Sequence, residues 1–283
     1  ASLTFSGDIG RPNDAVMKAP SPLLETDWIV AESTYGDRIH PPADLEQELG
    51  TVIRRVAGRG GVVVIPAFAV GRAQLLLHFI ARLKQRGDIP PVPAFLNSPM
   101  ASDVTELYHR HRGEHRLSEE ECKAMCQVAT IVNSVEESKA LNERRGPMVI
   151  VSASGMATGG RVLHHLKAFA PDPRNAIVLA GFQAGGTRGA ALAAGAKQIR
   201  IHGQDVPVRA EVAQLAAASA HADAAEIIAW LHTMPRPPRR VFITHGEAGP
   251  ADALRQRIEH ELDWEVGIPD YRDRIDLHAE AKQ

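Results

Sequence analysis

Short apolar runs alternate with amphipathic stretches along most of this 283-residue chain. The apolar runs, which predict buried strands, cover residues 27–34, 60–68, 147–154, 176–182 and 239–247. The stretches with helical periodicity cover residues 43–58, 73–85, 161–169 and 251–262. Strands that alternate with helices favour parallel pairing, so the pattern predicts an α/β fold built on a parallel sheet.

Glycines gather where the predicted strands end, as in SASGMATGG at 152–160 and GFQAGGTRG at 181–189. Proteins of the α/β class bind ligands at the carboxyl ends of their strands, and glycine lets the backbone approach a ligand closely. We therefore expect the chemistry at these ends.

The highly charged residues 99–141 are expected to form exposed helices and loops, and PRPPRR at 235–240 is expected to form a stiff linker.

Length and composition narrow the class of protein. The chain is long enough for about two domains with a sizeable apolar core. Its 32 basic and 34 acidic residues leave a net charge of -2, so any contact with nucleic acid must be local. No apolar run approaches the roughly 18 to 20 residues of a membrane helix, so we expect a soluble protein with no membrane partner. The two cysteines, Cys122 and Cys126, favour a reducing compartment and hence a cytoplasmic location.

Two acidic residues stand at predicted strand ends. Asp8 lies between Gly7 and Gly10 in SGDIG, which suits either a metal ligand or a carboxylate that caps a turn. Glu32 ends the apolar run in VAEST, where a carboxylate needs a partner to offset its desolvation. A hydrogen-bonded histidine would serve, and a strand-end or helix-capping role is the alternative.

Two histidines occupy comparable places. His221 precedes the helical stretch AAEIIAWL, so its ring would lie near a helix N-terminus, where the charged form is disfavoured and gives up its proton easily. Asp223 beside it is a candidate N-cap. His245 follows an apolar strand next to Gly246, a setting that suits a metal-binding or catalytic imidazole as well as an ordinary strand-end residue.

The strand-to-helix loops carry hydroxyls, guanidinium groups and backbone N–H groups, which together suit phosphate. The candidate phosphate-binding residues are Ser154, Gly155, Thr158, Arg188 and Arg72. Each arginine could pair with a phosphate through two N–H groups. The alternative is that the glycines of these loops only make tight turns.

A second group of potential metal ligands lies in one short stretch and consists of His109, His111, His115, Cys122 and Cys126. The group fits no established zinc spacing, and the arginines at positions 110, 112 and 116 would repel a cation. We therefore expect no structural zinc there.

Eight motifs in a fixed order carry a family resemblance: SGDIG, AESTYGDR, PAFAVGRAQLL, NSPMA, SASGMATGGRVLHHL, GFQAGGTRG, SAHAD and THGE. Together they resemble the RNA-processing metallo-β-lactamase superfamily with the β-CASP insertion, which includes the cleavage-and-polyadenylation endonuclease and the bacterial and archaeal β-CASP ribonucleases. The resemblance implies a parallel-sheet α/β β-CASP domain inserted in an αββα metallo-β-lactamase domain that is only partly present. It assigns residues 1–36 to a partial metallo-β-lactamase segment, 37–180 to the β-CASP domain, and 181–283 to the C-terminal metallo-β-lactamase (RNA-specificity) segment.

The resemblance also implies roles for individual residues. Asp8 would bridge two zinc ions, and His245 would be a terminal zinc ligand. Zinc lowers the pKa of a bridging water, and His221, oriented by Glu32, would protonate the leaving 3′ oxygen to give 5′-phosphate and 3′-hydroxyl ends. A histidine in the HGE motif is typical of the RNA-processing members, so the implied substrate is single-stranded RNA threaded between the two domains.

One family motif has no counterpart in the sequence. The zinc-binding HxHxDH motif would precede SGDIG, whereas the chain opens on Ala1 and enters a strand-like segment at once. We therefore expect an N-terminal part to be missing, and we expect this chain neither to bind two zinc ions tightly nor to cleave RNA by itself. Zinc-dependent RNA hydrolysis would belong to the parent protein.

Two other functions compete with this one. A catalytically silent β-CASP scaffold that binds RNA or a partner protein is the main alternative, and the intact Asp8, Glu32, His221 and His245 argue against it. A metal-dependent hydrolase of a small ester is supported only by the implied fold. Formation of a homodimer through the hydrolase domain is a further hypothesis.

Overall fold

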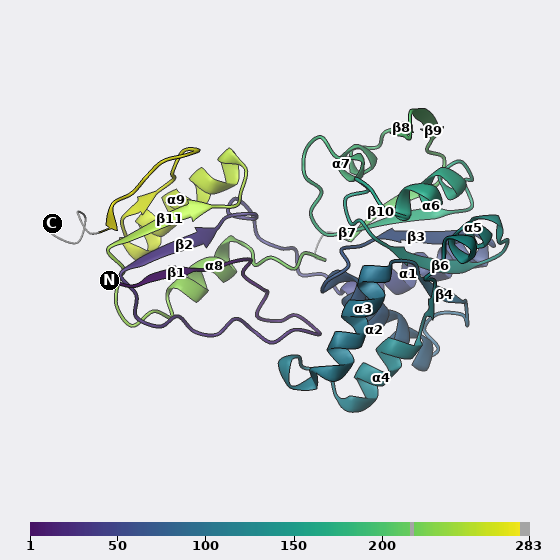
Figure 1. The fold of residues 1–283 in the computed structure, drawn as a ribbon, viewed down its shortest axis with the longest axis horizontal. Helices are drawn as coiled ribbons and strands as arrows, with labels where there is room; N and C mark the ends of the chain where they lie inside the picture. The colour runs from purple at the N-terminus through teal and green to yellow at the C-terminus, as the bar shows by residue number, and fades with distance from the viewer. Residues whose placement is uncertain (216–217, 278–283) are drawn as a thin grey trace. The chain divides into compact units, whose positions relative to one another are not determined.

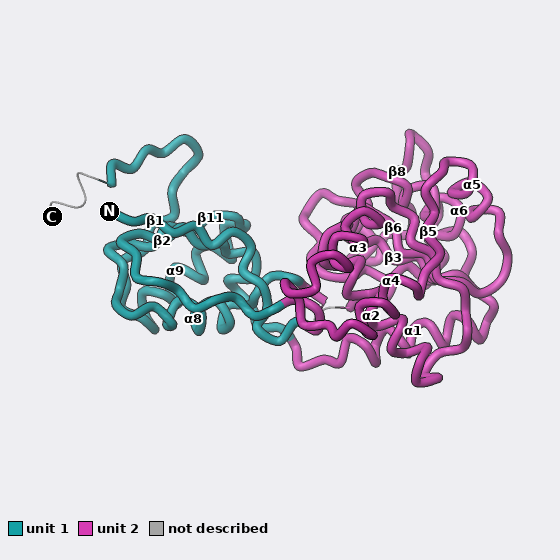
Figure 2. Tube along the Cα trace, turned by 60° about the horizontal axis from the view of Figure 1, so that its bottom comes forward, with its two compact units in different colours: residues 1–14, 18–40, 220–283 teal, residues 15–17, 41–219 magenta. Residues whose placement is uncertain are grey.

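The computed structural model describes residues 1–215 and 218–277, which fall into two compact units (Figures 1 and 2). Unit 1 comprises Ala1–Asp14, Lys18–His40 and the chain from Ala220 onward. Unit 2 comprises Ala15–Met17 and Pro41–Ser219. Each unit contains its own parallel sheet covered by helices, which confirms the expected α/β class.

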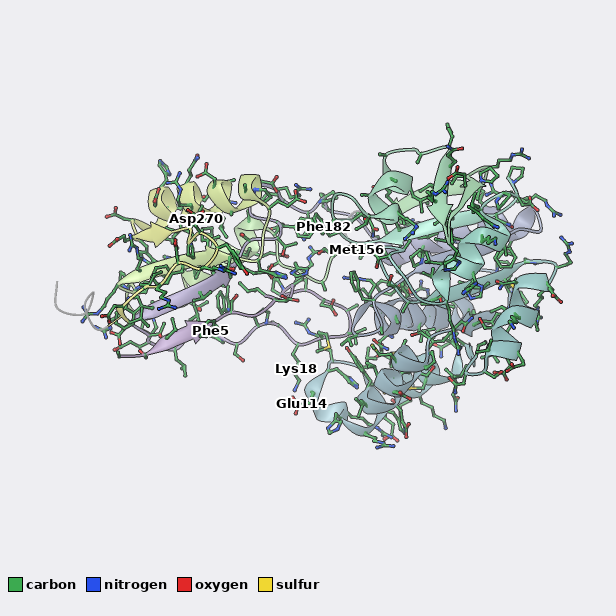
Figure 3. All side chains as sticks on the ribbon, turned by 45° about the horizontal axis from the view of Figure 1, so that its top comes forward. Phe5, Lys18, Glu114, Met156, Phe182 and Asp270 are labelled. Carbon is green, nitrogen blue, oxygen red and sulfur yellow. The ribbon has the colours of Figure 1, made fainter. Side chains whose placement is uncertain are left out.

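Unit 1 is built on a four-stranded parallel sheet in the order β1-β2-β11-β12. Its elements are β1 (Leu3–Phe5), β2 (Trp28–Glu32), α8 (Ala224–Leu231), β11 (Arg240–Thr244), α9 (Ala248–Leu262) and β12 (Val266–Gly267). Buried side chains of the two central strands, such as Ile29 and Val241, share one core with Ile227 and Leu254 of the helices. The edge strand β1 carries Phe5, labelled in Figure 3, with 69% of its surface exposed.

Unit 2 is built on a six-stranded sheet in the order β10-β7-β3-β6-β4-β5, in which every neighbouring pair is parallel. The strands are β3 (Val62–Pro66), β4 (Ala94–Leu96), β5 (Thr130–Ile131), β6 (Met148–Ser152), β7 (Ala176–Ala180) and β10 (Glu211–Leu215). Helix α1 (Leu45–Gly58) precedes β3. The helices between the strands are α2 (Arg72–Gln85), α3 (Pro99–Arg110), α4 (Glu119–Gln127), α5 (Val135–Glu143), α6 (Val162–Phe169) and α7 (Arg188–Ala193). A short antiparallel pair, β8 (Gln198–Ile201) and β9 (Gln204–Pro207), precedes β10.

Helices cover both faces of this sheet. Val63 of β3 packs in one core cluster with Leu76 of α2, whereas its neighbour Val64 packs in a second cluster with Leu166 of α6. Successive side chains of a strand point to opposite faces, so a strand buried on both sides needs apolar residues at every position. This is the reason why the strand over 60–68 reads as an unbroken apolar run.

The boundaries of the two compact units differ from the domain boundaries that the resemblance implies, and the domain assignment itself stays a prediction. Apart from Ala15–Met17, unit 2 begins at Pro41, a few residues beyond the expected boundary at residue 36. The return to unit 1 comes at Ala220 and not near residue 180, because β10 pairs with β7 along its whole length, from Glu211 beside Ala176 to Leu215 beside Ala180. Sheet pairing therefore keeps some forty further residues in unit 2, beyond the turn GFQAGGTRG.

Among the described residues, no helix combines the length and the apolarity that a membrane crossing requires.

A close backbone approach in unit 2 leads to a first prediction. A β-carbon on Gly61 would overlap the carbonyl oxygen of Arg174, whereas a β-carbon on Gly58, at the end of α1, would meet nothing within 4 Å. We expect Gly61→Ala to lower the free energy of unfolding by about 1–3 kcal/mol, as overpacking does. Gly58→Ala is the matched control and should stabilise by about 0.5–1 kcal/mol, because alanine favours helix.

Circular dichroism during thermal unfolding measures both effects, since unit 2 holds most of the helical residues. Equal melting temperatures for the two variants would contradict the steric role given to Gly61.

Candidate active site

The parallel pairing of β2 with β11 brings the carboxyl ends of both strands side by side. Thr244 of β11 is in register with Glu32 of β2, so His245 follows directly beside a buried carboxylate. His245 has a left-handed φ of 53°, which is uncommon for a residue other than glycine. A β-carbon on the next residue, Gly246, would overlap the Ser33 side chain, so only glycine lets the two strand-end loops approach this closely.

The carboxylate of Glu32 is 1% exposed and accepts hydrogen bonds from three residues. Its Oε1 accepts the N–H of Ile9 at 2.6 Å, and its Oε2 accepts the N–H of Thr34 at 3.4 Å. Nδ1 of His221 lies 3.0 Å from Oε1 and 2.9 Å from Oε2. His221 is therefore the histidine partner that the buried acid was expected to need.

These contacts decide the charge of Glu32. Burial raises the pKa of its carboxyl group, but the hydrogen bond and charge of His221, with the bonds from Thr34 and Ile9, outweigh burial and hold the pKa below its ordinary 4.5. The carboxylate is thus ionised at neutral pH. Because the Glu32 carboxylate lies next to Nδ1 of His221, it favours the neutral tautomer that carries its proton on Nδ1. Nε2 is then the ring nitrogen that faces away from Glu32.

Backbone contacts fix the segment that carries His221. The residue forms an isolated β-bridge with Gly10, and the N–H of Ala222 donates to the carbonyl oxygen of Ile9 at 2.7 Å. Asp223 accepts the N–H of Glu226 at 2.9 Å and caps α8, as expected from the sequence. His221 therefore lies just before a helix N-terminus.

His40 supports this segment and was missed by the sequence analysis. The residue is 7% exposed; its backbone N–H donates to Asp223 Oδ2 at 2.8 Å, and its Nε2 lies 3.0 Å from the carbonyl oxygen of His221. It stands some 180 residues before these partners in the chain and belongs to no recognisable spacing pattern. Only the packed structure reveals its role.

Asp8 and His245 complete the site on its exposed side. Oδ1 of Asp8 lies 3.6 Å from Nδ1 of His245, and the two side chains are 69% and 58% exposed. The rings of His221 and His245 are stacked, with centroids 5.8 Å apart. One potential ligand atom from each of Asp8, His221 and His245 lies within 4.8 Å of the others.

This set of side chains fits zinc in part. Carboxylate oxygen and imidazole nitrogen are both common zinc ligands, and zinc in proteins is almost always bound by four groups. Among the described residues, Asp8, His221 and His245 are the donors gathered here, and His221 also engages Glu32. Asp8 and His245 would thus hold a zinc ion together with ligands from outside this group.

The loop after β6 uses its own polar groups internally. Oγ of Ser154 accepts the N–H of Thr158 at 3.1 Å and the N–H of Gly159 at 3.3 Å. A β-carbon on Gly155 would lie 2.7 Å from the ring of Phe68, so glycine is needed there for packing. These contacts favour the tight-turn interpretation of this loop, and the phosphate-binding role of its residues stays a prediction.

The two candidate arginines also have structural surroundings. The guanidinium of Arg188, at the start of α7, donates to the carbonyl oxygens of Arg200, Ala157 and Thr158. Arg72, at the start of α2, is only 4% exposed. Burial argues against Arg72 as a phosphate ligand, whereas Arg188 stays a candidate whose N–H groups already have carbonyl partners.

The fold and the acid–histidine site are typical of a metallo-hydrolase. Two family models match it: the Beta-Casp domain over residues 73–192, and the Zn-dependent metallo-hydrolase RNA specificity domain over residues 205–269. The second match contains both His221 and His245. The chain belongs to the β-CASP group of RNA-processing metallo-β-lactamase proteins.

Curated relatives agree with this family. Ribonuclease TTHA0252 of Thermus thermophilus is 40% identical over 87% of the chain and 57% of its own length. The transcription termination factor FttA of Methanosarcina mazei is 33% identical over 80% of the chain and 37% of its own length. The RNase J-like protein of Methanocaldococcus jannaschii is 32% identical over 87% of the chain and 58% of its own length. The chain thus spans between 37% and 58% of the length of these relatives.

The lowered pKa of Glu32 leads to a second prediction. A carboxylate whose pKa falls on folding contributes stability that is fully present above its unfolded pKa and is lost as the pH falls through its folded pKa. We expect Glu32→Gln to lower the free energy of unfolding at pH 7 by about 1–3 kcal/mol. The difference from wild type should shrink as the pH falls below 4.5.

Tryptophan fluorescence during urea unfolding reports this effect, because the three tryptophans, Trp28, Trp230 and Trp264, all lie in unit 1. Glu25→Gln is the matched control, since this carboxylate is 56% exposed and pairs with Arg236 on the surface. It should change stability by less than about 0.5 kcal/mol. A Glu32→Gln effect that is independent of pH would refute the electrostatic explanation.

Proposed function

We propose that this protein hydrolyses phosphodiester bonds in single-stranded RNA with the help of zinc. The observation that carries the proposal is the buried Glu32 carboxylate bound to Nδ1 of His221, directly beside the two potential zinc ligands Asp8 and His245. An ionised acid that orients an imidazole beside metal ligands suits general acid catalysis. The ribonuclease names of two relatives and the RNA specificity match support RNA as the substrate.

Each side chain has a distinct task in this proposal. Zinc, when bound, would activate water as the nucleophile and would stabilise the developing charge on phosphate. Asp8 and His245 provide part of its ligand set. Nε2 of His221 donates a proton to the 3′ oxygen as the bond between phosphorus and that oxygen breaks, which leaves a 3′-hydroxyl and a 5′-phosphate. Glu32 holds the ring in place and balances the charge of the protonated imidazole.

A sulfur-substituted substrate tests the role of His221. In the natural full-length protein we expect His221→Ala to slow RNA cleavage by about 10²- to 10⁴-fold, because the 3′ oxygen then leaves without a proton. A substrate with sulfur at that bridging position should restore the rate of the variant to near that of wild type, since a thiolate leaves unprotonated. Rates of single-turnover cleavage measure both effects.

The control is His232→Ala, which changes an exposed histidine at the end of α8 and should leave both rates unchanged. An equal loss on the oxygen and sulfur substrates would refute proton donation by His221. A zinc-loaded wild-type protein that binds RNA but cleaves neither substrate would overturn hydrolysis and favour the silent scaffold. Duplex RNA and single-stranded DNA of the same sequence test the preference for single-stranded RNA.

We also propose that residues 1–283 do not cleave RNA by themselves. A zinc ion usually takes four protein or water ligands. At this site the described residues offer Asp8, His245 and the ring of His221, and the proposed reaction needs His221 for proton donation. The purified 283-residue chain with added zinc should therefore leave a single-stranded RNA intact in an electrophoretic assay, and robust cleavage would contradict this proposal.

A further inference from the structure

Helices α3 and α4 bring three potential metal ligands together in unit 2. Cys122 and Cys126 stand four residues apart on α4, so their side chains share one face of the helix. A capping box between Ser118 and Glu121 fixes where α4 begins. His109 lies in the last turn of α3, and its ring nitrogen and both sulfur atoms lie within 4.8 Å of one another.

The spacing of these atoms suits a tetrahedral metal ion. Zinc binds sulfur at about 2.3 Å and histidine nitrogen at about 2.0 Å, which sets two ligand atoms roughly 3.7 Å apart. The three atoms lie within 4.8 Å of one another, so each pair would have to approach by at most about 1 Å to reach this value. Thiolate and imidazole together are typical zinc ligands, and thiolate favours soft cations over magnesium or calcium.

Exposure increases across the cluster from one ligand to the next. Cys122 is fully buried, Cys126 is half-buried, and His109 is exposed. A surface hollow is lined by His109, Cys126 and Glu119, among other residues. A cation can therefore reach the ring of His109 and the sulfur atom of Cys126 from solvent, and Glu119 or a water can supply the fourth ligand.

The nearby arginines oppose a cation less than the sequence suggested. Arg110 forms an ion pair with Glu106, and Arg112 pairs with Glu119 at 2.6 Å. The two positive charges of a divalent cation balance the two negative charges of the thiolates, and the charges of Arg112 and Glu119 balance each other. Two of the three arginines that oppose a cation in the sequence are thus paired with glutamates.

The thiols resist ionisation while no cation is bound. Burial raises the pKa of Cys126 to about 11, and burial also raises the pKa of Cys122. A coordinating metal deprotonates a thiol outright, so binding would replace two thiol protons by one cation.

We propose that Cys122, Cys126 and His109 form a structural binding site for a thiolate-preferring divalent cation, with zinc as the best match. The site would link the end of α3 to the face of α4 and thereby stabilise this part of unit 2. It is separate from Asp8, His221 and His245 in unit 1 and does not depend on the proposed RNA hydrolysis.

Cobalt substitution tests the site, because Co²⁺ takes the place of zinc and absorbs strongly in the near ultraviolet when thiolate binds it. Cys122 and Cys126 are the two cysteines of the chain, so this band reports the proposed site alone. We expect about one Co²⁺ per 283-residue chain to produce the band, and zinc to displace it. The His245→Ala variant, which lacks a ligand of the other site, should give the same band.

Variants of each ligand separate binding from folding. Cys126→Ser should abolish the band. His109→Asn should weaken Co²⁺ binding by at least about tenfold, because the loss of a residue that only supports a metal ligand already lowers metal affinity by about 10- to 100-fold. His111→Asn, an exposed histidine two residues further on, is the matched control and should bind as wild type. Circular dichroism confirms that each variant is folded.

The opposite results would overturn the proposal. These are no thiolate band at one equivalent of Co²⁺, a band that survives Cys126→Ser, or an unchanged affinity in His109→Asn. Because His109 is exposed, its replacement decides the question even if Cys126→Ser fails to fold.

Discussion

The geometry of the candidate active site depends on one buried charge, the carboxylate of Glu32. An ionised acid at 1% exposure is tolerated only where hydrogen bonds replace the water that it loses. Ile9, Thr34 and His221 supply them from three separate parts of unit 1. The need to satisfy this charge thus ties the loop after β1, the end of β2 and the segment before α8 into one arrangement.

The sheet makes that arrangement possible. Parallel strands end at the same edge, and the pairing of β2 with β11 sets His245 beside Glu32 although about two hundred residues separate them in the chain. The large insertion between the two strands folds as unit 2 around its own sheet. A long insertion at a strand end costs little loop entropy when it folds by itself, so the site can stay intact around it.

The strands, the α/β class and the need of Glu32 for a hydrogen-bonding partner could be predicted from the sequence. These features follow from local apolar patterns and from the cost of burying a charge. The identity of His221 as that partner came from the order of motifs, since nothing local links two residues 189 positions apart. The strand β10 and the support from His40 escaped prediction. Both depend on tertiary pairing, between β10 and β7 and between His40 and Asp223.

The cluster on α3 and α4 shows why a list of nearby charges misleads when their partners are unknown. In the sequence, three arginines among the histidines and cysteines read as a cationic stretch. In the structure, Arg110 and Arg112 each meet a glutamate, and the helix pair selects one histidine of three to face both sulfurs. The electrostatic repulsion or attraction on a cation at a site depends on the charge that remains after neighbouring side chains have paired. At the cysteine cluster Arg112 is paired with Glu119, and the two thiolates formed on binding would balance the two positive charges of a zinc ion.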